Sequence, residues 1–104
     1  MPELTVDAES GQTVEVNGEG FLTDRLQWTP QVAEILARGA GIETLTERHW
    51  KVITCCREDA ARHGKTPGLR RISELSGVAA SELNRLFPSG PGELAALIAG
   101  LSKP

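Results

Sequence analysis

The sequence contains no tyrosine and few other aromatic residues, two tryptophans and two phenylalanines among 104 residues. It also has only two cysteines, no apolar run close to the roughly 20 residues that cross a bilayer, and no signal-peptide layout at its amino terminus. These absences argue against a disulfide-stapled secreted domain and against a membrane protein. We therefore expect a cytoplasmic protein without membrane association, and the length fits a single domain over residues 1–104.

Familiar catalytic motifs are also missing. The sequence has no glycine-rich phosphate loop, no GxSxG elbow and no CxxC pair. His49, Cys56 and His63 are spaced by seven residues, but two helical turns separate successive members by roughly 10.5 Å. A zinc ion needs ligand atoms about 2.0–2.3 Å away, so these three side chains cannot share one ion. We expect no metal and no cofactor, and the residues alone leave an enzymatic activity undecided.

The net charge of −3 hides an asymmetry. Residues 1–50 carry nine acidic and three basic side chains, whereas residues 51–104 carry five acidic and eight basic ones. A basic half can favour an anionic partner. The same asymmetry also fits two solvated faces without a function, and the sequence does not decide between these interpretations.

The first part of the chain predicts a β-hairpin over residues 4–16. Val14 and Val16 alternate with polar residues, as in a strand with one buried face. Residues 8–11 have the composition of a turn, ending in a glycine that can adopt positive φ.

The rest of the chain predicts a helical body over residues 29–100. Thr29 can cap a helix and Pro30 suits its first position. Thr46 can cap the longest helix, and Pro67 is expected to open a third one. Two further helices follow, interrupted by proline and glycine. The predicted fold is mainly α, a small helical bundle with an N-terminal β-hairpin and a helix-turn-helix-like segment.

The two cysteines are adjacent and lie in the longest predicted helix. Cys56 falls on the apolar face of Trp50 and Ile53, which predicts a small buried side chain. Cys55 points about 100° away and is the only candidate for a reactive thiol. Lys51 lies one turn before Cys55, but the middle of a helix gives a thiolate no help from the helix dipole. A structural role is the favoured interpretation.

Residues 69–87 have the spacing of a helix-turn-helix. Ile72 and Leu75 are expected to pack inward, and Gly77 to make the turn. In a DNA-binding protein the second helix would enter the major groove. The alternative interpretation is that two short helices joined by a tight turn simply pack stably and do not bind DNA. The acidic pI of about 5.3 favours this alternative. That second helix would present Ser81, Glu82, Asn84 and Arg85.

Four stretches of the sequence stand in the order that they have in one known family. They are GEGFLTDRLQWTPQVAEILA (18–37), GIETLTERHWKVI (41–53), PGLRRI (67–72) and LFPSGPGELAALIAGLSKP (86–104). Together they cover nearly the whole chain. Their Gly-Phe-Leu, Leu-Thr-x-x-His-Trp and Leu-Phe-Pro-x-Gly-Pro motifs make the pattern specific in combination. The chain resembles the DsrC/TusE family of sulfur-relay proteins, which includes the gamma subunit of dissimilatory sulfite reductase.

The resemblance implies a fold that agrees with the pattern above. It also implies that sulfur is carried as a persulfide on a cysteine near the end of a mobile C-terminal arm and is passed among sulfurtransferase partners. The TusE branch serves thiolation of the tRNA wobble uridine. The DsrC branch serves sulfite reductase and uses a second cysteine earlier in the arm.

The sequence departs from the family in the arm. The family arm continues past the Lys-Pro pair to its last cysteine, whereas this sequence ends at Pro104. The second arm cysteine aligns with Ala96, and the basic residue after the Pro-x-x-Arg stretch aligns with Glu74. Cys55 and Cys56 align with positions that the family fills with apolar or aromatic residues.

Three explanations follow from these departures. The leading hypothesis is a cysteine-less relative that keeps the docking surface and regulates sulfurtransferase or sulfite-reductase-like partners, or binds DNA. The second is a sequence that lacks the end of the arm and would still be TusE-like. The third is an active sulfur carrier that uses the Cys55 thiol.

The residues that we expect to contact a partner lie on the third helix and on the C-terminal segment. Arg70 matches the family arginine, and its cation could meet an anionic persulfide or a carboxylate. The alternative is a surface ion pair worth less than about 1 kcal/mol. The apolar residues of the last helix would pack it onto the body or release it as an arm. The predicted partner-binding residues are Arg70, Arg71, Leu97, Leu101 and Lys103.

Overall fold

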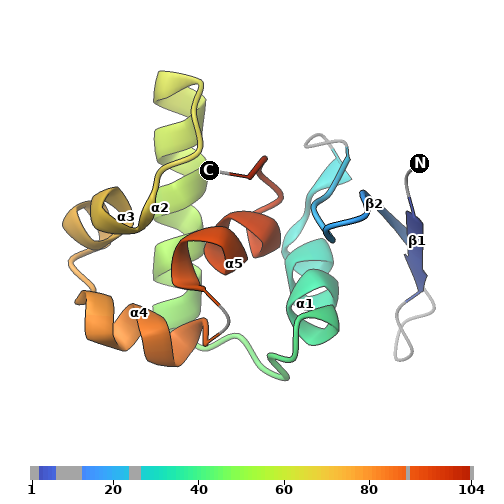
Figure 1. The fold of residues 1–104 in the computed structure, drawn as a ribbon, viewed down its shortest axis with the longest axis horizontal. Helices are drawn as coiled ribbons and strands as arrows, with labels where there is room; N and C mark the ends of the chain where they lie inside the picture. The colour runs from blue at the N-terminus through green and yellow to red at the C-terminus, as the bar shows by residue number, and fades with distance from the viewer. Residues whose placement is uncertain (1–2, 7–12, 24–26, 89, 104) are drawn as a thin grey trace.

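The computed structural model describes residues 3–6, 13–23, 27–88 and 90–103, with residues 3–6 described by their main chain (Figure 1). A two-stranded sheet precedes five helices in the described chain, which confirms the mainly helical fold. The strands are β1 (Glu3–Val6) and β2 (Thr13–Val16), and the helices are α1 (Pro30–Gly39), α2 (Glu47–His63), α3 (Leu69–Ser76), α4 (Ala80–Leu86) and α5 (Pro91–Ile98).

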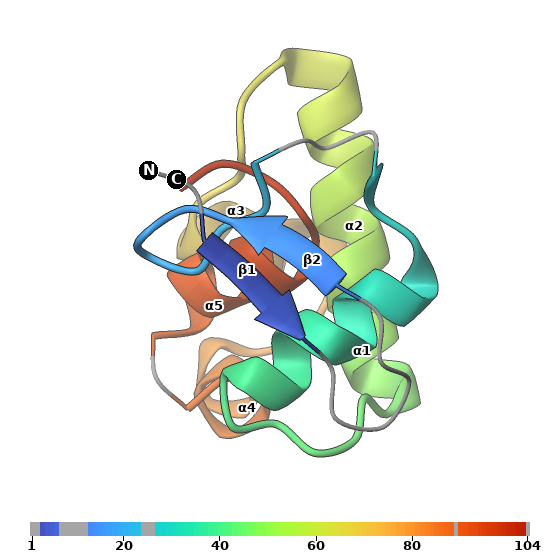
Figure 2. The ribbon, with the colours of Figure 1, turned by 90° about the vertical axis from the view of Figure 1, so that its right-hand side faces the viewer.

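The predicted hairpin is present. Strands β1 and β2 are antiparallel, with Glu3 opposite Val16 and Val6 opposite Thr13. Val14 and Val16 are buried and pack in one cluster with the apolar face of α1, so the sheet lies against that helix (Figure 2). The predicted turn at residues 8–11 lies outside the described residues.

The main core forms around α5, which contacts each of the four other helices (Figure 1). Phe87, which follows α4, is fully buried in this core. The other large side chains that are fully buried include Ile53, Ile72, Leu83 and Ile98. Because the last helix supplies part of this core, its end is tied to the rest of the fold.

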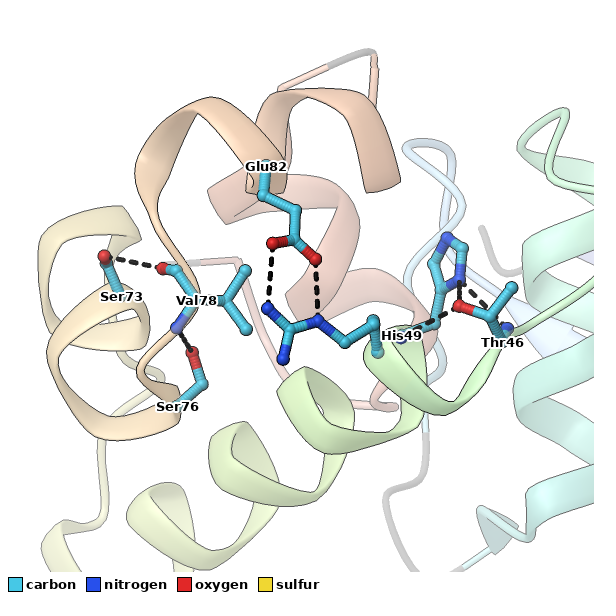
Figure 3. A network of polar contacts seen from close by, with 7 residues as sticks. Thr46, His49, Ser73, Ser76, Val78 and Glu82 are labelled. Carbon is cyan, nitrogen blue, oxygen red and sulfur yellow. Dashed lines mark hydrogen bonds and ion pairs between the residues drawn. The ribbon is translucent and has the colours of Figure 1, made fainter.

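The two predicted N-caps are confirmed. The Thr29 hydroxyl accepts a 3.1 Å bond from the Val32 amide at the start of α1. At α2, Thr46 and His49 form a capping box, in which the Thr46 amide donates to His49 Nδ1 at 3.0 Å (Figure 3). That bond makes Nδ1 the acceptor, so Nε2 carries the proton and donates to the Leu86 carbonyl at 2.9 Å. His49 therefore joins the start of α2 to the end of α4.

The pair α3 and α4 differs from expectation at two places. The third helix begins at Leu69 and not at Pro67, because Gly68 supplies the extended N-cap residue. Leu75 is 44% exposed, so the prediction that it packs inward is wrong, whereas Ile72 is buried as predicted. Gly77 makes the turn with φ +74.

Hydroxyl groups fix the turn between α3 and α4. Ser73 donates to the Val78 carbonyl at 2.7 Å, and the Val78 amide donates to Ser76 Oγ at 3.2 Å (Figure 3). These side chains satisfy main-chain groups that the two short helices leave unpaired. Among the described residues, no helix combines the length and the apolar character needed to cross a membrane.

Candidate docking surface and the two cysteines

The C-terminal end of α5 is closed by a Schellman motif. Gly100 adopts φ +72, its amide donates to the Leu97 carbonyl at 3.1 Å, and the Leu101 amide donates to the Ala96 carbonyl at 3.0 Å. Leu101 is 3% exposed as a result. A Cβ at Gly100 would lie 2.4 Å from Cδ1 of Trp28, so only glycine fits.

Two side chains from distant parts of the chain donate hydrogen bonds to the carbonyl groups at the C-terminal end of this helix. Trp28 Nε1 donates to the Ile98 carbonyl at 2.9 Å, and Arg57 Nη1 donates to the Ala99 carbonyl at 2.7 Å. The Arg57 guanidinium also lies 3.9 Å from the centre of the Trp28 ring. A cation is favourable at a helix C-terminus and over an indole face, so Arg57 satisfies two preferences at once.

The residues after the Schellman motif are held from both sides. Ser102 and Thr66 share a hydrogen bond of 3.2 Å between their hydroxyls. Lys103 Nζ lies 3.1 Å from Glu19 Oε2, and the hydrogen bond and charge of Glu19 raise the pKa of Lys103. Leu97 is half-buried and touches both apolar clusters. The C-terminal segment therefore lies on the body in this conformation.

The two predicted arginines of α3 have different surroundings. Arg70 has a 95% exposed side chain and forms an ion pair with Glu74 at 3.3 Å, one turn later. Arg71 makes two bonds of 2.8 and 2.7 Å to the buried carboxylate of Asp59. Arg71 lowers the pKa of Asp59, and Asp59 raises the pKa of Arg71. Arg70 is thus accessible to a partner, whereas Arg71 joins α3 to α2.

Both cysteines are free thiols with raised pKa values. Cys56 is buried in the main core, as predicted, and burial raises its pKa to about 12. Cys55 is half-buried; desolvation and then the charge of Glu58 raise its pKa, against the opposing charge of Lys51. A thiolate is the reactive form of cysteine, so neither thiol is activated in this fold.

The other residues considered as sulfur or metal sites are buried in the core or bonded to neighbouring residues. Ala96 is fully buried in the middle of α5. His49 is occupied by the cap and by Leu86, and His63 Nε2 lies 3.5 Å from Asp59. In the part of the chain that the structure describes, no three His, Cys, Asp or Glu side chains come together in a way that could hold a metal ion.

Sequence reasoning missed the residues that hold the C-terminal segment. Trp28 and Arg57 bond to carbonyls that lie 70 and 42 positions away, and Glu19 pairs with Lys103 near the other end of the chain. Local patterns contain no signal for such distant partners. The sequence gives a weak signal at Gly100, because a glycine just after an apolar helix indicates a Schellman motif. The motif does not identify the side chains that pack against it.

Comparisons with known proteins agree over nearly the whole chain. The family model described as "DsrC like protein" matches residues 8–104. The chain is 35% identical over 104 residues to the dissimilatory-type sulfite reductase subunit gamma of Nitratidesulfovibrio vulgaris, covering 100% of this chain and 96% of that protein. It is 37% identical to the sulfurtransferase TusE of Photorhabdus laumondii, covering 90% of each. The NMR structure of Allochromatium vinosum DsrC superposes with a TM-score of 0.85 at 31% identity, covering 100% of this chain and 96% of that one.

Proposed function

The chain belongs to the DsrC-like family, and on that premise we propose that it acts by protein–protein binding in a sulfur-relay or sulfite-reductase system without carrying sulfur itself. Its partners would be sulfurtransferases or a sulfite-reductase-like protein, as the names of its relatives suggest. We place this binding in the cytoplasm. Its role beside them would be regulatory, because it would occupy a relay position without accepting sulfur.

The state of the thiols is the observation that best supports this proposal. Forming a persulfide requires a thiolate that attacks a sulfur donor. The pKa values of Cys55 and Cys56 are both raised, and Cys56 is closed off in the core. The resemblance places the second arm cysteine at Ala96, which has no sulfur and no exposure. These features favour binding over transfer.

The proposed docking surface has an accessible part and a covered part. Arg70 extends into solvent, and its pair with Glu74 is an exposed i, i+4 contact that a partner carboxylate can replace. Arg71 would hold α3 in place for that contact through Asp59. The covered part is Leu101, which would reach a partner only after the C-terminal segment leaves the body. Leu97 and Lys103 of the same segment are partly accessible on the body, since Leu97 is half-buried and the Lys103 side chain is 52% exposed.

The test is binding to a purified sulfurtransferase and to a purified sulfite reductase, measured by calorimetry. Arg70→Glu places like charges against an acidic partner surface, so we expect the affinity to fall about tenfold or more. Arg85→Glu makes the same charge change at an exposed site on α4 and should change the affinity less than about twofold. Equal effects of the two substitutions, or wild-type binding by Arg70→Glu, would remove Arg70 from the docking surface.

A second candidate function is DNA binding through α3 and α4. Asn84 and Arg85 are exposed on α4, and Arg48 pairs with Glu82 at 2.7 Å, which offsets the carboxylate that would oppose phosphate. Fluorescence anisotropy with duplex DNA tests this at low and at raised salt. Binding that weakens steeply with salt would support it, and an absence of binding at low salt would exclude it.

A further inference from the structure

A groove is lined by residues from the end of β2, from the segment that follows it, from α1 and from α5. Figure 1 shows β2 and α1 on the other side of α5 from α3. The volume of the groove, about 310 Å³, is at the lower end of the roughly 300–1,000 Å³ of ligand pockets. It can therefore receive one large side chain of a partner. Its walls are mostly apolar and come from distant parts of the sequence, chiefly Val16, Ile35, Leu36, Leu94 and Leu97.

Glycines keep this groove open. Gly39 is the last residue of α1 and lines the groove, and a Cβ built on it would meet no other atom within 4 Å. Gly20 adopts φ +93, and its Cβ would lie 3.4 Å from Leu97 Cδ1. A long side chain at position 39 can thus be added beside the groove without displacing the fold.

The only charged group among the described residues that line the groove is Glu19. Its carboxylate already holds an ammonium group of this chain, because Lys103 Nζ lies 3.1 Å away. The two side chains are 61% and 52% exposed, so this pair is weak and exchanges readily. Glu93 also acts on Lys103, since its charge adds to that of Glu19 in raising the pKa of the ammonium group. The rim of the groove is therefore a place that selects cations.

We propose that this groove is a docking site for a partner-protein segment that places one large apolar side chain between α1 and α5 and an adjacent Lys or Arg on Glu19. The partner's cation takes the place of Lys103. Charge complementarity supports a basic occupant, because the charged group at the described lining of the groove is the Glu19 carboxylate, which already pairs with an ammonium group. The site does not involve Arg70, but it shares Leu97 and Lys103 with the C-terminal part of the docking surface proposed above.

The probes are three synthetic peptides, one of alternating Leu and Lys, one of alternating Leu and Glu, and one of alternating Ala and Lys. Calorimetry should detect binding of the Leu/Lys peptide, and NMR should shift the amides of Val16, Gly39 and Leu97. The Leu/Glu peptide should fail because of its charge, and the Ala/Lys peptide because it has no apolar side chain for the groove. Equal binding of the two Lys peptides would mean general charge attraction and would overturn the proposal.

Opposite effects of two charge changes give the sharpest test. Glu19→Gln removes the carboxylate and should weaken binding of the Leu/Lys peptide about two- to fivefold. Lys103→Ala removes the internal competitor and should tighten binding by a similar factor. Lys65→Ala is the matched control, since it removes the same charge from an exposed site outside the groove. If Lys103→Ala weakens binding, or tightens it no more than Lys65→Ala does, the competition is absent.

The groove itself is tested by filling it. Gly39→Met should weaken binding of the Leu/Lys peptide about tenfold, because the added side chain takes the space of the ligand. Ala80→Met adds the same side chain to an exposed position on α4 and should change nothing. Equal affinities of the two variants would overturn the site. Sedimentation of the wild type adds a further test, since a dimer that Gly39→Met dissociates would make a second copy of this chain the occupant.

Discussion

Gly100→Ala gives the most direct measure of how the C-terminal segment is held. Alanine in the left-handed region costs about 1–2 kcal/mol. The new Cβ would also lie 2.4 Å from Trp28 Cδ1 and 2.9 Å from Cγ, so the indole must move. Its movement would break the bond from Trp28 Nε1 to Ile98 and the contact with Arg57.

These losses set the expected size of the effect. The hydrogen bond contributes about 1 kcal/mol and the cation–π contact about 1 kcal/mol. With the backbone cost, Gly100→Ala should lower the free energy of unfolding by about 3–4 kcal/mol and the melting temperature by more than about 10 °C. Urea unfolding followed by circular dichroism measures the first quantity, and a thermal scan measures the second.

Gly41→Ala is the matched control. Gly41 occupies the same place in the Schellman motif of α1, with φ +93, but its Cβ would meet nothing within 4 Å. It should cost only the backbone strain of about 1–2 kcal/mol. If Gly100→Ala is no more destabilising than Gly41→Ala, the contacts of Trp28 do not hold the segment and the reasoning is wrong.

Three further predictions concern buried polar groups. The hydrogen bonds from Arg71 lower the pKa of Asp59, so the stability that this carboxylate contributes is complete above its unfolded pKa of about 3.9 and is lost as the pH falls through the lower folded value. Asp59→Asn should therefore reduce the fall of the unfolding free energy at acid pH. An unchanged dependence of the unfolding free energy on acid pH would contradict this. Burial raises the pKa of Cys56 to about 12, so iodoacetamide at about pH 8 should label Cys55 slowly and Cys56 only after unfolding, as peptide mass spectrometry can check. His49→Phe keeps a ring but removes both nitrogen bonds, and it should cost about 1–3 kcal/mol in urea unfolding; an unchanged midpoint would contradict the role of the ring nitrogens.

Local patterns were sufficient to predict most of the secondary structure. The Thr29 and Thr46 caps and the alternation of Val14 and Val16 depend on near neighbours in the chain, and each was found as expected. The prediction that Leu75 is buried was wrong. The spacing of apolar residues identifies one face of a helix but does not show how much of that face the neighbouring helix covers.

The candidate site was less predictable than the fold. Arg70 could be chosen from the sequence through the family motif, but its 95% exposure and the confinement of Arg71 by Asp59 depend on how α3 meets α2. The stack of Arg57 from α2 on Trp28, which precedes α1, joins two distant segments at the end of α5, and nothing within a short window of the sequence specifies it. The raised pKa of the Cys55 thiol also depends on burial in the folded chain.

The central claim is that this DsrC-like protein binds relay partners without accepting sulfur. Intact-mass spectrometry after incubation with a persulfide-charged sulfurtransferase tests it most directly, with the wild type beside Cys55→Ser and a pull-down of the donor from the same mixture. We predict that the mass of the wild type stays unchanged while the donor is retained in the pull-down. A gain of one sulfur atom that is absent from Cys55→Ser would make Cys55 a carrier and would contradict the claim.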